Sequence, residues 1–145
     1  MPDTDPHEVW RALLSLVHEK HDRRKEACDA LDLSFVRIKA LRRIAVHATT
    51  LRDLAAALQT DAPYTTLVVD DLERRGLVQR VPHPTDRRAK LVTATDHGQA
   101  EAARAEAIIT RPPAQMFELT ADELSALSAI TGKLTGDATS RRDPR

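Results

Sequence analysis

The sequence has little of what several classes of protein require. One cysteine in 145 residues excludes an intramolecular disulfide framework. Aromatic residues make up 3% of the chain and glycines number only four, so neither an aromatic-rich sheet nor a glycine-rich phosphate loop is indicated. No stretch approaches the roughly 20 consecutive apolar residues of a membrane helix. The first residues lack the basic start and apolar run of a signal peptide, so we expect a cytoplasmic protein without a membrane partner.

The composition that is present favours packed helices in one domain. Hydrophobic residues make up 41% and charged residues 30%, a globular balance in which the helix formers Ala and Leu are plentiful. The 22 basic and 22 acidic residues cancel overall, but six basic residues and one acid lie between Arg74 and Lys90. A local positive field attracts phosphates even where the total charge is zero, so nucleic acid remains a candidate partner.

Two amphipathic helices are predicted in the first third of the chain. Apolar residues at three-to-four spacing predict one helix from about residue 6 to residue 29. The same face continues through His21, Arg24 and Cys28, which is polar for a core. Ser34 is expected to cap the second helix, which extends to about Ala45.

The middle of the chain has the pattern of a helix-turn-helix. Thr50 can cap a short helix over residues 51–58, and a tight turn separates it from a second helix over residues 62–75. Asp61 is expected to cap this second helix, because its carboxylate can accept an N–H group that the first turn leaves free. Gly76 follows the helix, where a left-handed backbone is needed.

The second helix is expected to present its first half to a ligand. Its outward residues are predicted to be small, aromatic or hydroxyl-bearing: Ala62, Tyr64, Thr65, Thr66 and Val69. Its inward residues are predicted to be Leu67, Val68 and Leu72. Hydroxyl groups can donate to phosphates, and the arginines that end the helix, Arg74 and Arg75, can reach a DNA backbone.

A β hairpin with a basic tip is predicted after the helix-turn-helix. Residues 77–81 and 90–95 have β-favouring patterns, and residues 82–89 form the loop between them. The loop contains Asp86, Arg87 and Arg88, and the carboxylate is expected to brace one guanidinium in an extended pose. A braced arginine suits a narrow minor groove, where the potential is most negative.

Two more helices are predicted in the last third. Thr95 can cap an Ala-rich helix that must stop before Pro112-Pro113. Thr120 and Glu123 have capping-box spacing at the start of the last helix. The fold class expected is therefore mainly α with a small β-hairpin wing, followed by a polar tail over residues 136–145 that we expect to be disordered.

Two segments resemble the MarR family of bacterial regulators. They are Asp70-Asp71-Leu72-Glu73-Arg74-Arg75-Gly76-Leu77-Val78 and the stretch from Pro84 to Gly98, Pro-Thr-Asp-Arg-Arg-Ala-Lys-Leu-Val-Thr-Ala-Thr-Asp-His-Gly. The resemblance implies a homodimer in which residues 6–30 and 96–135 form a helical dimerisation region. It also implies a winged helix-turn-helix lobe over residues 34–95.

The resemblance implies roles for individual residues as well. Pro63 to Thr66 would contact the major groove of a pseudo-palindromic operator, Arg88 would enter the minor groove, and Asp86 would brace it. The chain would then be a repressor that a phenolic or aromatic-acid effector releases from DNA. A pocket for the carboxylate of such an effector is expected at His21, Arg24 and Arg37.

Alternative functions remain open from the sequence. His18 and His21 have a spacing found in metal sites, and Cys28 stands near basic residues that can activate a thiolate for redox sensing. A winged helix can also bind protein rather than DNA. An enzyme is disfavoured, because we find no phosphate loop, nucleophile elbow or metal-ligand set, and no catalytic residue or cofactor is predicted.

Overall fold

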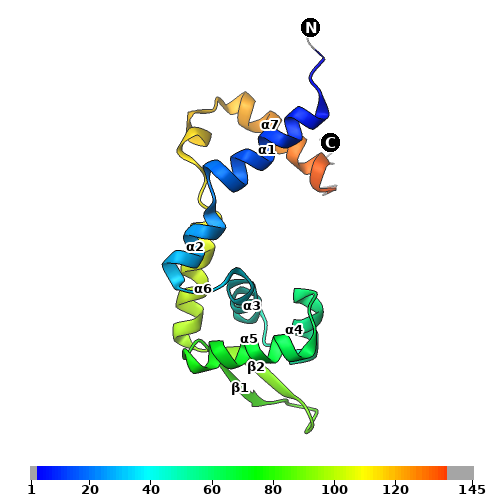
Figure 1. Cartoon of the computed structure of the whole chain (residues 1–145), viewed down its shortest axis with the longest axis vertical. Coiled ribbons are helices and arrows are strands. Elements are labelled where there is room, and N and C mark those ends of the chain that lie inside the picture. Colours follow the sequence, from blue (N-terminus) through cyan, green and yellow to red (C-terminus); the bar gives the residue numbers. More distant parts are fainter. Residues whose placement is uncertain (1–2, 137–145) are drawn as a thin grey trace, which may run out of the picture. The chain divides into compact units, whose positions relative to one another are not determined.

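The computed structural model describes residues 3–136 of the chain (Figure 1). The elements in chain order are α1 (Pro6–Ser15), the π-helical η1 (Leu16–Lys20), α2 (Arg23–Leu31), α3 (Phe35–Val46), α4 (Leu51–Leu58), α5 (Ala62–Arg74), β1 (Val78–Pro82), β2 (Lys90–Ala94), α6 (Asp96–Ile109), the 3-10 helix η2 (Ala114–Glu118) and α7 (Ala121–Thr135). The predicted class, mainly α with one β hairpin, is confirmed. The chain divides into two compact units, residues 1–111 and 112–145.

The core of the first unit is built around α3. This helix packs against α2, α4, α5, α6 and β2 (Figure 1). Its inward side chains Ile38, Leu41 and Ile44 are almost completely buried. They meet the buried residues of the neighbouring elements, among them Leu54, Val68, Val69, Leu72, Val78, Val92 and Ala105. One continuous core therefore holds α4, α5 and the hairpin in a fixed arrangement.

Side-chain caps start these helices where the sequence predicts them. The hydroxyl oxygens of Ser34, Thr50 and Thr95 and the carboxylate of Asp61 each accept a backbone N–H from the first turn of α3, α4, α6 and α5 respectively. Each cap satisfies a donor that would otherwise have no partner in the helix. The four caps fix the chain positions at which these helices begin.

The prediction of one helix over residues 6–29 is wrong. The α-helical hydrogen bonding gives way to the π-helix η1 at Leu16, and the chain bends at His21. The Asp22 carboxylate then accepts the backbone N–H of Lys25 and starts α2 as a new helix. The apolar periodicity ends at Val17, and the polar residues from Arg23 onward, including Arg24, belong to a different helix rather than to a polar continuation of the first.

The hairpin forms an antiparallel pair in which Val78 lies opposite Ala94 and Pro82 opposite Lys90. The connection between α3 and α4 adds one more backbone pairing to this small sheet. Thr49 and Val92 exchange two N–H to carbonyl hydrogen bonds, of 3.1 and 2.8 Å. The beginning of the helix-turn-helix is thereby tied directly to β2.

The start of α6 lies closely against the end of α5. Gly76 has a φ of +73°, which confirms the left-handed position predicted for it. The Thr95 hydroxyl donates to the Gly76 carbonyl at 2.6 Å and also caps α6 by accepting the N–H of Gly98. A Cβ atom on Gly98 would lie 1.8 Å from the Leu77 carbonyl oxygen, so no larger residue fits there without a backbone shift.

The second unit contains η2 and α7. The Thr120 hydroxyl accepts the N–H of Glu123 at 3.1 Å, which confirms the predicted start of α7. The helix ends at Gly136, whose φ is +74°. Of the tail predicted to be disordered, residues 137–145 lie outside the described residues. Every helix within residues 3–136 is too short or too polar to span a bilayer.

Candidate nucleic-acid interface

The outward face of α5 differs from the one that the sequence predicts. Thr65 and Val69 were expected to face outward but are completely buried, whereas Leu67 was expected inward and is 56% exposed. Thr65, Val68, Val69 and Leu72 form the inner stripe, with the i, i+3, i+4, i+7 spacing of a helix face. The Thr65 hydroxyl is accommodated there because it donates to the Asp61 carbonyl oxygen at 2.8 Å.

The remaining outward residues of α5 lie where the sequence places them. Ala62, Pro63 and Tyr64 are exposed and Thr66 is half-buried. The Tyr64 side chain is 39% exposed. With Thr65 withdrawn into the core, the accessible surface of the first two turns consists of these residues and Leu67.

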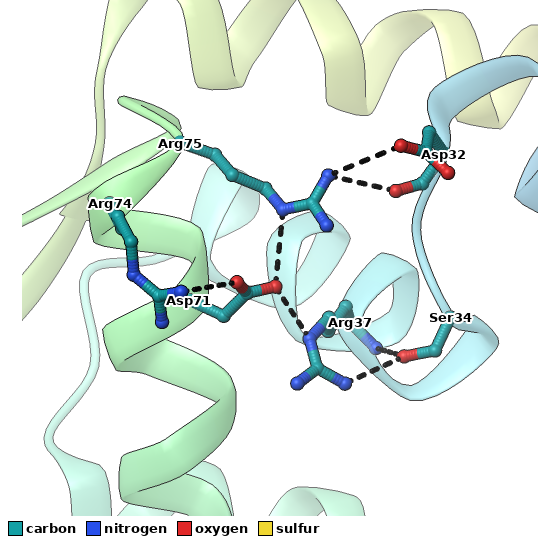
Figure 2. Close-up of polar contacts among 6 residues, drawn as sticks. All are labelled: Asp32, Ser34, Arg37, Asp71, Arg74 and Arg75. Carbon is teal, nitrogen blue, oxygen red and sulfur yellow. Dashed lines mark hydrogen bonds and ion pairs between the residues drawn. The ribbon is translucent and has the colours of Figure 1, made fainter.

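The end of α5 is held by an ion-pair network centred on Asp71 (Figure 2). Its Oδ2 accepts hydrogen bonds from Arg37 Nε at 2.8 Å and from Arg75 Nε at 3.1 Å. Arg75 also donates from Nη1 to the Asp32 carbonyl oxygen at 2.9 Å. Since Arg37 and Asp32 lie in and before α3, the network ties the end of α5 to that helix.

The charge of Asp71 is maintained in this network. Its side chain is 15% exposed, and burial raises the pKa of a carboxyl group. The hydrogen bond from Arg37 and the positive charges of Arg75, Arg37 and Arg74 outweigh that effect and lower the pKa of Asp71 overall. Asp71 is thus an ionised anchor at neutral pH.

The network gives the predicted arginines different roles. Arg37 and Arg75 are engaged in hydrogen bonds inside the protein. Arg74 has only a 3.5 Å ion pair with Asp71 and its side chain is 73% exposed (Figure 2). Of the two arginines that end α5, Arg74 is the one free to contact a ligand.

A second ion-pair cluster, centred on Arg80 of β1, joins the hairpin to α5. Arg80 binds Asp70 and also donates from Nη1 to Glu73 at 2.9 Å, while its backbone N–H donates to the same Glu73 carboxylate at 3.1 Å. Sequence reasoning counted Arg80 among the basic residues and missed this role. The partners are seven to ten residues apart in the sequence, so the pairing cannot be predicted without knowing where β1 lies relative to α5.

The hairpin tip is ordered by hydrogen bonds to its own backbone. His83 Nδ1 accepts the N–H groups of Thr85 at 3.2 Å and Asp86 at 3.1 Å. The Asp86 carboxylate accepts the backbone N–H of Arg88 at 2.9 Å. Aspartate side chains readily accept the backbone N–H of the residue two positions later, which closes a local turn.

The prediction that Asp86 braces a guanidinium is therefore wrong: its carboxylate binds the backbone N–H of Arg88. Arg87 and Arg88 are both exposed, and within residues 3–136 neither guanidinium has a hydrogen-bond or ion-pair partner. The tip thus presents two free positive charges on a shaped loop.

The residues predicted to form an effector pocket have separate contacts. The Arg24 guanidinium stacks over the Phe35 ring, 4.6 Å from its centroid, and Arg37 binds Asp71. His21 lies at the bend before α2. A hollow of about 420 Å³ lies at the end of α3 and along α4, and none of the three lines it. Its lining residues are Arg43, His47, Ala48, Thr49, Asp53, Ala56 and Ala57.

The predicted metal and redox residues gain no support from their surroundings. Among residues 3–136, no three His, Cys, Asp or Glu side chains gather as metal ligands around His18 and His21 or elsewhere. Burial raises the pKa of the Cys28 thiol, and the charges of Asp29 and Asp22 raise it further. A raised pKa disfavours the thiolate that redox sensing requires.

Comparison with known proteins identifies the fold. Residues 33–90 match the model of the MarR family. A cysteine-to-serine mutant of MarR from E. coli is 30% identical, with a TM-score of 0.68, and the match covers 86% of this chain and 94% of that one. The same mutant complexed with operator DNA is 28% identical, with a TM-score of 0.58 and coverage of 90% and 99%.

A more distant structure has the same fold. A mutant of MepR from S. aureus is 20% identical, with a TM-score of 0.75, and the match covers 92% of this chain and 98% of that one. These similarities confirm that α4, α5 and the hairpin form a winged helix-turn-helix.

Proposed function

This chain belongs to the MarR family of winged-helix regulators, and on that premise we propose that it is a homodimeric regulator of transcription that binds a specific DNA sequence. It acts by binding in the cytoplasm and not by catalysis. The DNA complex of the E. coli relative supports duplex DNA as the partner, because this chain covers 99% of that protein.

One observation carries the proposal: the free positive charges and the exposed face of α5 belong to one rigid lobe. Arg74 ends α5, and Arg87 and Arg88 lie at the tip of the hairpin that Arg80 fastens to that helix. The recognition helix α5 enters the major groove with Pro63, Tyr64 and Thr66. The wing places Arg88 in the adjacent minor groove.

The dimer is formed by residues 6–30 and 96–135, while residues 34–95 form the DNA-binding lobe. Neither α1 nor α7 buries a residue. Instead, α1 exposes Trp10 at 60%, η1 exposes Val17 at 55%, and α7 exposes Ile130 and Leu134 at 54% and 70%. Exposed apolar side chains on both helices support the proposal that a second copy of the chain covers them.

The mechanism follows from the symmetry of such a dimer. Two recognition helices contact half-sites about one DNA turn apart on a pseudo-palindrome, and contacts to phosphates supply most of the affinity. Binding over a promoter represses transcription. A small aromatic acid that prefers another arrangement of the protein would shift the population away from the DNA-binding form.

Selection from a pool of random duplexes with the purified chain tests the proposal. We expect enrichment of an inverted repeat whose half-sites are centred about 10 base pairs apart. The matched control is a variant that lacks both wing charges, Arg87→Ala with Arg88→Ala, which should enrich the repeat weakly or not at all. A wild-type pool that stays as random as the input would refute DNA-sequence recognition and favour a protein-binding module.

A further inference from the structure

Before Arg74, the recognition helix lacks the side chains that read purines by paired hydrogen bonds. Arg and Lys bind guanine in this way and Asn and Gln bind adenine, and none of the four occurs between Ala62 and Glu73. The acids at the end of this segment are engaged, since Asp70 and Glu73 bind Arg80 and Asp71 binds Arg37. Direct readout by this part of α5 must use other chemistry.

Apolar surface is what this face offers instead. Leu67 is 56% exposed in the middle of α5, and Pro63 lies one turn before it on the same face. Tyr64 is 39% exposed beside them. A single exposed leucine needs no explanation, but this one stands in an apolar cluster about two to three turns before the exposed guanidinium of Arg74.

The chemistry of the major groove contains one apolar group, the 5-methyl of thymine. We propose that Leu67, which shares the exposed face of α5 with Pro63, is a specificity-determining residue that contacts thymine methyl groups in each half-site. This inference rests on the proposed DNA-binding function and adds to it the base that the helix selects. At the centre of α5, base recognition would then use an apolar contact rather than hydrogen bonds.

Replacing thymine by uracil in the selected operator tests this contact, because uracil lacks only the methyl group. Fluorescence anisotropy would compare operators with thymine or uracil at each half-site position, for wild type, Leu67→Ala and the control Val46→Ala. Val46 is an equally apolar, 71% exposed residue on α3, outside the proposed interface. Circular dichroism and thermal unfolding would establish that the variants are folded, as exposure of both side chains leads us to expect.

The expected result is a loss confined to one or two thymines. Wild type and Val46→Ala should bind the uracil operator about threefold to tenfold more weakly at those positions, as expected for the loss of one buried methyl group. Leu67→Ala should bind thymine and uracil operators equally. A second selection with Leu67→Ala should lose the preference for thymine at the same positions.

Two results would overturn the inference while leaving DNA binding intact. One is a wild type that binds both operators equally, and the other is a Leu67→Ala variant that loses as much affinity on uracil substitution as wild type. Failure of every protein to bind any operator better than scrambled DNA would instead refute the proposed function, and this inference with it.

Discussion

At the scale of single residues, the ion-pair networks decide which charged groups are available for binding. Asp71 holds Arg37 and Arg75, and Asp70 with Glu73 holds Arg80, so these three arginines are used inside the lobe. Arginines with the same charge in the sequence therefore have different functions. Of the arginines of α5 and the wing, Arg74, Arg87 and Arg88 remain exposed at the surface that we assign to DNA.

Replacing Asp71 by Asn should weaken the lobe at neutral pH. The change leaves Arg37 without its counter-charge, so we expect the free energy of unfolding to fall by about 1–3 kcal/mol in urea denaturation at pH 7. The control Asp29→Asn removes an ion pair with Lys25 in which both side chains are well exposed. It should change stability by less than about 1 kcal/mol.

The loss of stability in Asp71→Asn should depend on pH. The pKa of Asp71 is lower in the folded than in the unfolded chain, so its contribution is fully present above the unfolded value and is lost as pH falls through the folded one. The stability difference between wild type and Asp71→Asn should therefore shrink between about pH 5 and pH 2. A difference that stayed constant over this range would contradict the assignment.

Gly98 is a position where a single methyl group should be costly. Gly98→Ala would place Cβ 1.8 Å from the Leu77 carbonyl oxygen. This oxygen also accepts the backbone N–H of Thr95, so a shift away from Cβ would disturb that hydrogen bond. We expect the free energy of unfolding to fall by about 1–3 kcal/mol or more, which would be measured as a lower midpoint of thermal unfolding. Gly136→Ala is the control without a steric clash, since nothing lies within 4 Å; its φ of +74° means that it reports only the cost of alanine in a left-handed backbone. Equal effects of the two variants would argue against the close approach.

At the scale of elements, local chemistry in the sequence predicts most of the fold. Ser34, Thr50, Asp61 and Thr95 cap helices at the predicted positions, because a cap depends only on residues two or three apart. The hairpin and the left-handed Gly76 were likewise predictable from short patterns. These features need no knowledge of what packs against them.

Two errors at the candidate site come from features that depend on distant residues. Polarity predicts Leu67 inside and Thr65 outside, but the elements packed against α5 bury Thr65, and the local Asp61 carbonyl oxygen accepts its hydroxyl. The pairing of Arg80 with α5 depends on the path of β1. Sequence alone identified the helix and the wing of the candidate site, but not which face of the helix is exposed.

The connection between hairpin and α5 makes a prediction for the wing as an element. Arg80→Ala removes the charge that neutralises Asp70 and Glu73 and weakens the attachment of β1 to α5, because only the backbone N–H of residue 80 still binds the Glu73 carboxylate. We expect DNA binding to weaken by about tenfold or more, because two uncompensated carboxylates then stand near phosphates.

The control for this variant restores the balance of charge. Adding Asp70→Asn and Glu73→Gln to Arg80→Ala removes the excess negative charge but not the loosened wing, so the triple variant should regain part of the affinity. Anisotropy titration against the selected operator measures both. If Arg80→Ala bound as well as wild type, the cluster would have no part in DNA binding.

At the scale of the whole molecule, the proposed dimer would cover apolar side chains that α1 and α7 expose, among them Trp10 and Ile130. Ile130→Asp should convert the dimer to a monomer, because a carboxylate in an apolar interface cannot be solvated. Sedimentation equilibrium would give the mass. The control Glu123→Asp lies at the capped start of α7 and should stay dimeric. A wild-type chain that sediments as a monomer at micromolar concentration would contradict the dimer.

The central claim is that this chain recognises duplex DNA through α5 and the wing, and its most direct test is one titration. Fluorescence anisotropy would follow wild type, Arg88→Ala and Arg104→Ala on the selected operator at several salt concentrations, with scrambled DNA as competitor. Arg104 is an exposed arginine of α6, 3.7 Å from Glu101, and serves as the matched control.

We predict that wild type and Arg104→Ala bind tightly, resist the competitor and weaken steeply with salt, as counterion release requires. Arg88→Ala should bind about 1–3 kcal/mol more weakly while remaining folded and dimeric. Binding that is equal for operator and scrambled DNA, and unchanged in Arg88→Ala, would contradict the claim.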